Sequence, residues 1–269
     1  MLSLEVFYVR FLLIINMGVF VYRVRPINSH TLDELSNLYL WFSRPCGFKG
    51  DINDANIGAF VEDTEAIKKG IISICPNFDF DKWYEQMGYI GICCFTTELP
   101  TSDELRHFPN CGNGRGICIE YDTAKLEDFF AKDSKIPIPP IFHDVIYDNE
   151  PTKLDTCGDW SILWEKGKDY NKYKTIKNIF KYSDSRVADT FIIKLLTRIN
   201  SKFSNQKETR LIMGGCLLQN YSRDVLGYKI SIPDNTINRV IVYSKVGGKW
   251  IDELKKIEYL RNKIELSNK

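Results

Sequence analysis

The sequence predicts an α+β fold built on a mixed, largely antiparallel sheet. Short apolar segments with the alternation of β-strands recur along the 269-residue chain, and segments with a helical period stand between them. Its residues are 44% hydrophobic, which is enough for a large core. We find no internal repeat, low-complexity tract or linker. We therefore predict one domain over residues 18–269, with a helical insertion at about 160–203.

The N-terminal half mixes strands with helices. "GVFVYRVRPIN" (residues 18–28) alternates as a strand, which places Tyr22 and Val24 on one face and Arg23 and Arg25 on the other. A proline at position 26 ends it. The elements expected next are a helix at 29–38 capped by Ser29 or Thr31, a strand at 39–45, helices at 61–71 and 78–87, and an apolar strand at 89–98.

The C-terminal half has the same mixture of elements. "QKETRLIM" (residues 206–213) changes from polar to apolar within a few positions, and strand alternation would put Gln206, Glu208 and Arg210 on one face. The strands expected in this half lie at 116–122, 143–148, 208–213, 228–233 and 236–244, and the helices at 123–132 and 250–265.

Charge and cysteine content exclude two classes of protein. Lysine and arginine number 36 against 35 acidic residues, so the whole surface is not built for nucleic acid, although a local patch stays open. Eight cysteines are too few for a disulfide scaffold in a chain of this length, and no Cys-x-x-Cys occurs. We expect reduced thiols in the core and no metal site.

The first 17 residues are apolar, but they lack the basic cluster and the cleavage site of a signal peptide, and Arg10 interrupts the run. We interpret residues 1–17 as an N-terminal extension, with Met17 as the natural start. The alternative is an extra edge strand. We expect a cytoplasmic protein that does not associate with a membrane.

Polar groups stand at the ends of three predicted strands. They are Arg23 and Arg25, then Thr96 and Thr97, and finally the Gln-x-Glu that ends at Glu208. A cleft lined by them would offer guanidinium groups to a diphosphate. It would also offer a carboxylate that can accept a hydrogen bond from a ribose hydroxyl and stabilise an oxocarbenium-like transition state.

This order of motifs resembles the ADP-ribosyltransferase superfamily, in the branch with a strand arginine, a Ser-Thr-Ser-like strand end and a final Glu-x-Glu or Gln-x-Glu. The resemblance implies a split sheet around a cleft for NAD+, which is the substrate. It assigns the NAD+ phosphate and ribose to Arg25 or Arg23, with Tyr22 beside them. Thr96 and Thr97 would stand for the Ser-Thr-Ser scaffold.

The same resemblance implies roles for the Gln-x-Glu segment. Glu208 would be the catalytic glutamate on the nicotinamide ribose, Gln206 would face the acceptor, and Phe203 would lie on the preceding target-recognition loop. In the superfamily a glutamine at the place of Gln206 occurs where the acceptor is not arginine, including enzymes that modify nucleic-acid bases.

A second resemblance covers most of the chain. The segments "YRVRPIN", "LWFSRP", "ICCFTTE", "GRGICIEYD" and "KETRLI" look like an uncharacterised bacterial domain family associated with phage defence. Arg25 aligns with that family's arginine and Glu208 with its last glutamate. "FKGDIN" departs from the usual Phe-Asn-Asp-Pro, and "HFPNCGN" departs from the usual Trp-Ser-His-Tyr loop.

One basic segment has aromatic residues interleaved, at residues 165–186. Lys172, Lys174 and Lys177 could neutralise phosphates while the neighbouring rings stack on unpaired bases. The alternative is an ordinary helix with its lysines in water and its aromatics in the core. Together with Gln206, the segment favours RNA or another nucleic acid over protein as the acceptor.

Each motif also has an ordinary structural interpretation. Arg23 and Arg25 could be charges on an edge strand. Thr96 and Thr97 could be residues that favour a strand. Glu208 and Arg210 could form a surface ion pair. The three motifs in this order favour an NAD-dependent mono-ADP-ribosyltransferase, acting as a toxin or anti-phage effector. A cognate antitoxin or chaperone would then restrain it. The alternatives are a non-catalytic module that binds nucleic acid or protein on the same fold, and an NAD glycohydrolase.

Overall fold

The computed structural model describes residues 20–44, 90–133, 140–149, 196–213 and 226–267. The N-terminal extension and the helices expected at 61–71 and 78–87 lie outside these residues, as does most of the insertion expected at 160–203. Among the described residues, no helix is both long and apolar enough to cross a membrane.

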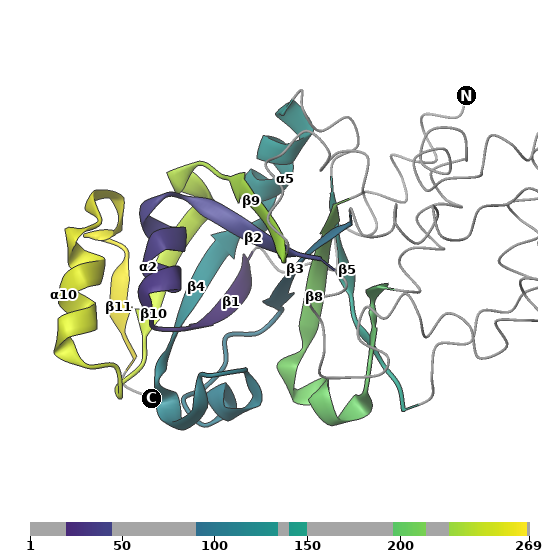
Figure 1. Cartoon of the computed structure of the whole chain (residues 1–269), viewed down its shortest axis with the longest axis horizontal. Helices are drawn as coiled ribbons and strands as arrows, with labels where there is room; N and C mark the ends of the chain where they lie inside the picture. The colour runs from purple at the N-terminus through teal and green to yellow at the C-terminus, as the bar shows by residue number, and fades with distance from the viewer. Residues whose placement is uncertain (1–19, 45–89, 134–139, 150–195, 214–225, 268–269) are drawn as a thin grey trace, which may run out of the picture.

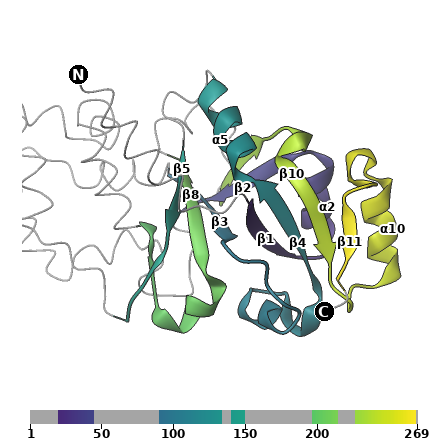
Figure 2. The same cartoon turned by 180° about the vertical axis from the view of Figure 1, so that it is seen from behind.

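The described strands form a nine-stranded sheet and a separate two-stranded one. The order along the large sheet is β11-β10-β4-β1-β3-β2-β9, with β8 paired to β3 and β5 paired to β8 (Figures 1 and 2). Its pairs are antiparallel except β10 with β11, which confirms the α+β class with a mostly antiparallel, mixed sheet. The large sheet contains β1 (Phe20–Pro26), β2 (Tyr39–Ser43), β3 (Gly91–Thr96), β4 (Gly116–Asp122), β5 (Ile141–Asp144), β8 (Glu208–Met213), β9 (Gly227–Ser231), β10 (Ile237–Val242) and β11 (Ile264–Leu266), and the small one contains β6 (Ile146–Tyr147) and β7 (Arg198–Ile199).

The large sheet forks at β3. Strand β8 pairs with β3 along the whole of residues 91–96 and so fills one edge of it. The other edge meets β1 at a single residue pair, Tyr22 with Thr96, and meets β2 at a single pair, Ser43 with Ile92. Between these two pairs β1 and β2 separate, and Figure 1 shows β2 and β9 running obliquely to β1 and β4. The fork therefore lies beside Tyr22, near the start of β1.

The described helices are short, and two of the three described α-helices are capped by a side chain at the N-terminus. In α2 (Ser29–Ser36) the cap is Asn28, whose side chain accepts a hydrogen bond from the Thr31 N–H. This corrects the prediction of Ser29 or Thr31, because the chain enters the helix one residue earlier. The other described helices are α5 (Thr123–Lys132), α10 (Gly248–Lys256) and the 3₁₀ turns η2 (Glu104–His107), η3 (Gly112–Gly114), η5 (Ser201–Gln206), η6 (Asp234–Thr236) and η7 (Glu258–Leu260).

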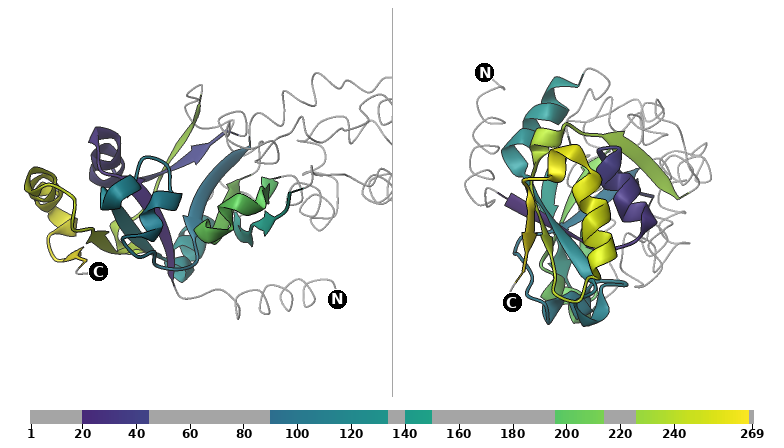
Figure 3. Two further views of the ribbon diagram at one scale, coloured as in Figure 1. Left: turned by 90° about the horizontal axis from the view of Figure 1, so that it is seen from below. Right: turned by 90° about the vertical axis from the view of Figure 1, so that its left-hand side faces the viewer.

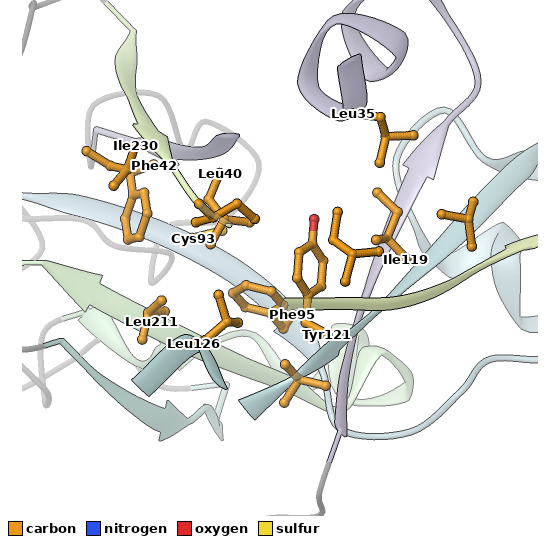
Figure 4. Close-up of a cluster of buried hydrophobic side chains, with 14 of the residues drawn as sticks. Leu35, Leu40, Phe42, Cys93, Phe95, Ile119, Tyr121, Leu126, Leu211 and Ile230 are labelled. Atoms are coloured by element: carbon orange, nitrogen blue, oxygen red, sulfur yellow. The ribbon is translucent and has the colours of Figure 1, made fainter. Parts of the chain in front are cut away.

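The three α-helices among the described residues all contribute to one apolar core on one face of the sheet. Leu35 of α2, Phe130 of α5 and Leu254 of α10 are buried in it. The right-hand view of Figure 3 shows α2 and α10 on the same side of the strands. Figure 4 shows the strand side chains of this cluster, among them Phe95 and Tyr121, whose rings meet edge to face with centroids 5.5 Å apart. Burying each large apolar side chain contributes about 1.5–3 kcal/mol.

A smaller apolar cluster covers part of the opposite face. It joins Leu105 of η2 and Cys111 to Cys118 and Ile241 of the sheet, with Tyr22 and Val24 packed against it. The described cysteines are free thiols, as expected, and burial raises the pKa of Cys93 to about 11. That thiol is therefore a core group rather than a nucleophile.

Three expected elements differ in the structure. The C-terminal helix ends at Lys256, and Ile264–Leu266 instead forms β11, because the open edge of β10 offers backbone hydrogen bonds. The single strand expected at 143–148 is two strands in the structure, because β5 pairs with β8 whereas β6 pairs with β7. The end of the expected helical insertion is the strand β7 followed by the 3₁₀ turn η5.

Candidate functional site

Three of the predicted site residues lie side by side across the sheet. Tyr22 on β1 is opposite Thr96 on β3, and Thr96 is opposite Glu208 on β8. Directly opposed residues of antiparallel strands share a face, so these side chains form one polar row. The row continues through Glu120 on β4 to Arg239 on β10. It lies at the fork of the sheet, on the face opposite the main core.

Glu120 anchors the far end of the row. Its Oε2 accepts hydrogen bonds from Arg239 Nε and Nη2 at 2.9 and 2.7 Å, and its Oε1 accepts one from Asn238. Burial and the hydrogen bond to the Glu120 carboxylate raise the pKa of Tyr22 above its ordinary value. Tyr22 is therefore held as a neutral phenol beside Thr96.

Glu208 and Arg210 form a buried ion pair, which replaces the surface pair considered from the sequence. The side chain of Arg210 is fully buried and that of Glu208 is 8% exposed. Arg210 Nε donates to Glu208 Oε1 at 2.7 Å, and Arg210 Nη1 donates to the Leu196 carbonyl at 2.6 Å. Among the described residues, no donor is bonded to Glu208 Oε2. Within the described part of the chain, the carboxylate is thus bonded at one oxygen.

Thr97 holds the turn that precedes Glu208. Its N–H and its hydroxyl both donate to the Lys207 carbonyl, at 3.0 and 3.3 Å. Lys207 has a φ of 44°, in the left-handed region that costs a non-glycine residue about 1–2 kcal/mol. Lys207 also pairs with Glu98 in the loop after β3. These contacts join the end of β3 to the start of β8.

Arg23 and Arg25 point to the face of the sheet opposite the polar row. Both reach Glu34 on α2: Arg23 Nη1 bonds Oε1, and Arg25 Nη2 lies 2.8 Å from Oε2. Arg23 Nη2 also donates to the Trp41 carbonyl at 3.2 Å, which links the two arms of the fork. The Arg25 side chain is 27% exposed, and its Nε has no hydrogen-bond partner among the described residues. The structure therefore separates the arginines from Glu208 by the thickness of the sheet.

Gln206 is outside β8, because the left-handed Lys207 interrupts the strand alternation expected from the sequence. It ends the 3₁₀ turn η5, and its Nε2 donates to the His107 carbonyl at 2.6 Å. Phe203 lies in the same turn, half-buried, with Lys202 Nζ 4.8 Å from the centre of its ring. The target-binding candidates Lys172, Lys174 and Lys177 lie outside the described residues.

Sequence reasoning missed four residues around this site. Glu120 lies in the apolar stretch of β4, where a buried carboxylate signals a charged partner, whereas Glu34 lies in the polar sequence of α2, on the opposite face of the sheet, and had no such signal. Tyr147 accepts a hydrogen bond from the Glu208 N–H, and Leu196 accepts one from Arg210. Neither carries a sequence signal, since each is brought to Glu208 by the pairing of β6 with β7.

No group of three or more metal-binding side chains comes together in the part of the chain that the structure describes. Comparison with protein-family models, with curated proteins and with solved structures finds no match to this chain.

Proposed function

We propose that the protein is an NAD-dependent mono-ADP-ribosyltransferase that acts on a macromolecular target. The observation that carries the proposal is the row of Tyr22, Thr96 and Glu208 at the fork of the sheet. Three segments far apart in the sequence, each singled out by its resemblance to the superfamily, meet there. The half-buried tyrosine and the 8%-exposed glutamate provide a site of low dielectric.

Glu208 would supply the transition-state contact. Oε1 is held by Arg210, so Oε2 would accept a hydrogen bond from a hydroxyl of the nicotinamide ribose. As the bond from C1′ to the nicotinamide nitrogen breaks, its electron pair leaves with neutral nicotinamide. The ribose then carries positive charge, which the carboxylate stabilises. A nucleophile on the acceptor bonds to C1′ and loses its proton, which completes the transfer.

Of the two arginines that the resemblance assigns to the phosphates, Arg25 is the more exposed. It lies on the face opposite Glu208, so one NAD+ would contact both residues only by passing through the fork of the sheet. Arg23 is 7% exposed and its guanidinium already bonds Glu34 and the Trp41 carbonyl. Arg25 is more exposed and keeps an Nε donor without a partner among the described residues. A bound diphosphate would compete with Glu34 for that guanidinium.

The acceptor and the biological role rest on the sequence. Gln206 and the basic segment at 165–186 support RNA or another nucleic acid over protein as the acceptor. A cytoplasmic toxin or anti-phage effector of this kind would need restraint in its host, so a cognate antitoxin or chaperone is an expected partner.

The proposal is tested by incubating the purified protein with radiolabelled NAD+ and a bacterial extract that contains RNA and protein. Wild type is compared with Glu208→Gln, and with Glu253→Gln on α10 as a control with the same change of charge, on an element that does not contact β8 (Figure 1). We expect Glu208→Gln to lower labelling about 10²- to 10³-fold, the cost of removing one transition-state contact. Sensitivity of the label to nuclease or protease identifies the acceptor. A folded, fully active Glu208→Gln protein would contradict the assignment.

The same assay separates the two alternatives. Release of nicotinamide without any labelled macromolecule would indicate an NAD glycohydrolase, with water as the acceptor. One observation favours a non-catalytic binding module: both arginines of β1 are already engaged by Glu34. Absence of both label and nicotinamide release would support that module, and binding to RNA would then be measured directly.

A further inference from the structure

The peptide bond between Lys207 and Glu208 is held from both sides. On its carbonyl side the Lys207 oxygen accepts two hydrogen bonds from Thr97. On its nitrogen side the Glu208 N–H donates to the hydroxyl oxygen of Tyr147 at 2.6 Å. Since Lys207 is in the left-handed region, this peptide needs such contacts to keep its orientation.

Tyr147 is itself fixed by the small parallel sheet. The residues on either side of it donate main-chain hydrogen bonds to β7: Ile146 N to the Thr197 carbonyl at 2.7 Å and Asp148 N to the Ile199 carbonyl at 2.9 Å. An ion pair between Arg198 and Asp148, with Nη2 and Oδ2 2.5 Å apart, joins the same two strands. Tyr147 therefore reaches Glu208 from a segment with several independent anchors.

The Tyr147 hydroxyl also stays protonated. Burial, the largest influence, raises its pKa to about 12, and the nearby Glu208 carboxylate acts in the same direction. A neutral phenol accepts the Glu208 N–H through its oxygen and keeps its own proton available to donate. A tyrosine at this position thus provides a hydrogen-bonding group that an apolar ring of the same size lacks.

We propose that Tyr147 is a positioning residue for Glu208, holding its main-chain N–H so that carboxylate oxygen Oε2 is directed at the substrate. The inference rests on the proposed function, because it assigns Glu208 the contact with the ribose. In this proposal Arg210 orients the Glu208 carboxylate and Tyr147 orients the Glu208 main chain.

The test is Tyr147→Phe, which removes the hydroxyl and keeps the ring. Tyr259→Phe is the matched control, since its hydroxyl also bonds one main-chain group, the Leu35 carbonyl at 2.7 Å, far from Glu208. kcat and KM for nicotinamide release are measured together with the melting temperature. We expect Tyr147→Phe to lower kcat about 5- to 10-fold at a nearly unchanged KM for NAD+, the effect of one hydrogen bond lost from the transition state. The control should keep the wild-type kcat.

A purely structural role for Tyr147 predicts a lower melting temperature with the wild-type kcat, as for the control. That result, in an assay where wild type is active and Glu208→Gln is not, would overturn the inference and leave the proposed function intact. If wild type releases no nicotinamide and labels no acceptor, the proposed function fails and the positioning role fails with it.

Discussion

Two of the arginine–glutamate clusters among the described residues lie on opposite faces of one sheet, and they differ in how many guanidinium groups contact the carboxylate. Glu34 is 1% exposed and meets two guanidinium groups, one at each oxygen. Glu208 is 8% exposed and meets one guanidinium at one oxygen. Among the described residues, Glu34 under α2 thus has a guanidinium beside each oxygen, although its Oε2 accepts no hydrogen bond, whereas Glu208 at the fork has a guanidinium beside one oxygen. Under the proposed function, the carboxylate with one guanidinium is the one that would bind a substrate.

The largest effect is expected from Glu34→Gln. It leaves Arg23 buried without its anionic partner, and breaking such a pair costs about 3–5 kcal/mol of unfolding free energy. Denaturant unfolding measures the loss. Asp33→Asn on the same helix is the control, because Asp33 is 41% exposed and its pair with Lys229 should contribute less than about 1 kcal/mol. Equal losses for the two variants would refute the buried role of Glu34.

The second effect is a contribution of His143, which lies beside Arg210, to the loss of stability at acidic pH. His143 on β5 is opposite Arg210, and burial lowers its pKa to about 4. The unfolded state, with a pKa of about 6.5, binds the proton first. Stability therefore falls as the pH drops from about 6.5 to about 4, by at most about 3 kcal/mol. Unfolding curves of His143→Gln should fall less steeply over this window than those of wild type; identical slopes would contradict the prediction.

Arg210→Met should have a smaller effect than Glu34→Gln. It leaves Glu208 unpaired, but the 8% exposure of that side chain gives water some access to the charge. We expect a loss of about 2 kcal/mol of unfolding free energy, and no detectable NAD+ cleavage if the proposed function holds. Unfolding and nicotinamide release are both measured. A stable, fully active Arg210→Met protein would show that the pair has neither role.

The smallest effect is expected from Arg25→Met. Partial exposure reduces the pair with Glu34 to about 1 kcal/mol, and Arg23 still neutralises that carboxylate. Under the proposed function the KM for NAD+ should rise several-fold while kcat changes little. Arg23→Met would instead lower stability strongly. A KM that does not change in Arg25→Met would remove Arg25 from the candidate site.

The strands near the site follow from local pattern, so the sequence predicts them well. β8 has the expected limits, and the alternation of β1 places Tyr22 and Arg25 on opposite faces as expected. Local pattern does not show which strands pair. The sequence therefore could not reveal that Arg25 shares a face with Glu34 of α2 rather than with Glu208, nor that β6 brings Tyr147 to Glu208.

The local sequence pattern also could not predict that Lys207 interrupts the strand before Glu208. A lysine carries no preference for a left-handed conformation, and here the contacts with Thr97 stabilise it. This one residue moves Gln206 out of the strand and against the His107 carbonyl. Glutamine and glutamate two positions apart thus have unrelated surroundings.

The pairing of β3 with β8 has a consequence for synthesis of the chain. The edge of β3 stays open until residues 208–213, more than a hundred positions later, have been made. Contacts this distant in sequence form late and slowly. A nascent chain that stops before Glu208 contains Tyr22 and Thr96 but cannot complete the row. If the protein is a toxin, the ribosome that makes it holds only an inactive fragment until most of the message has been translated.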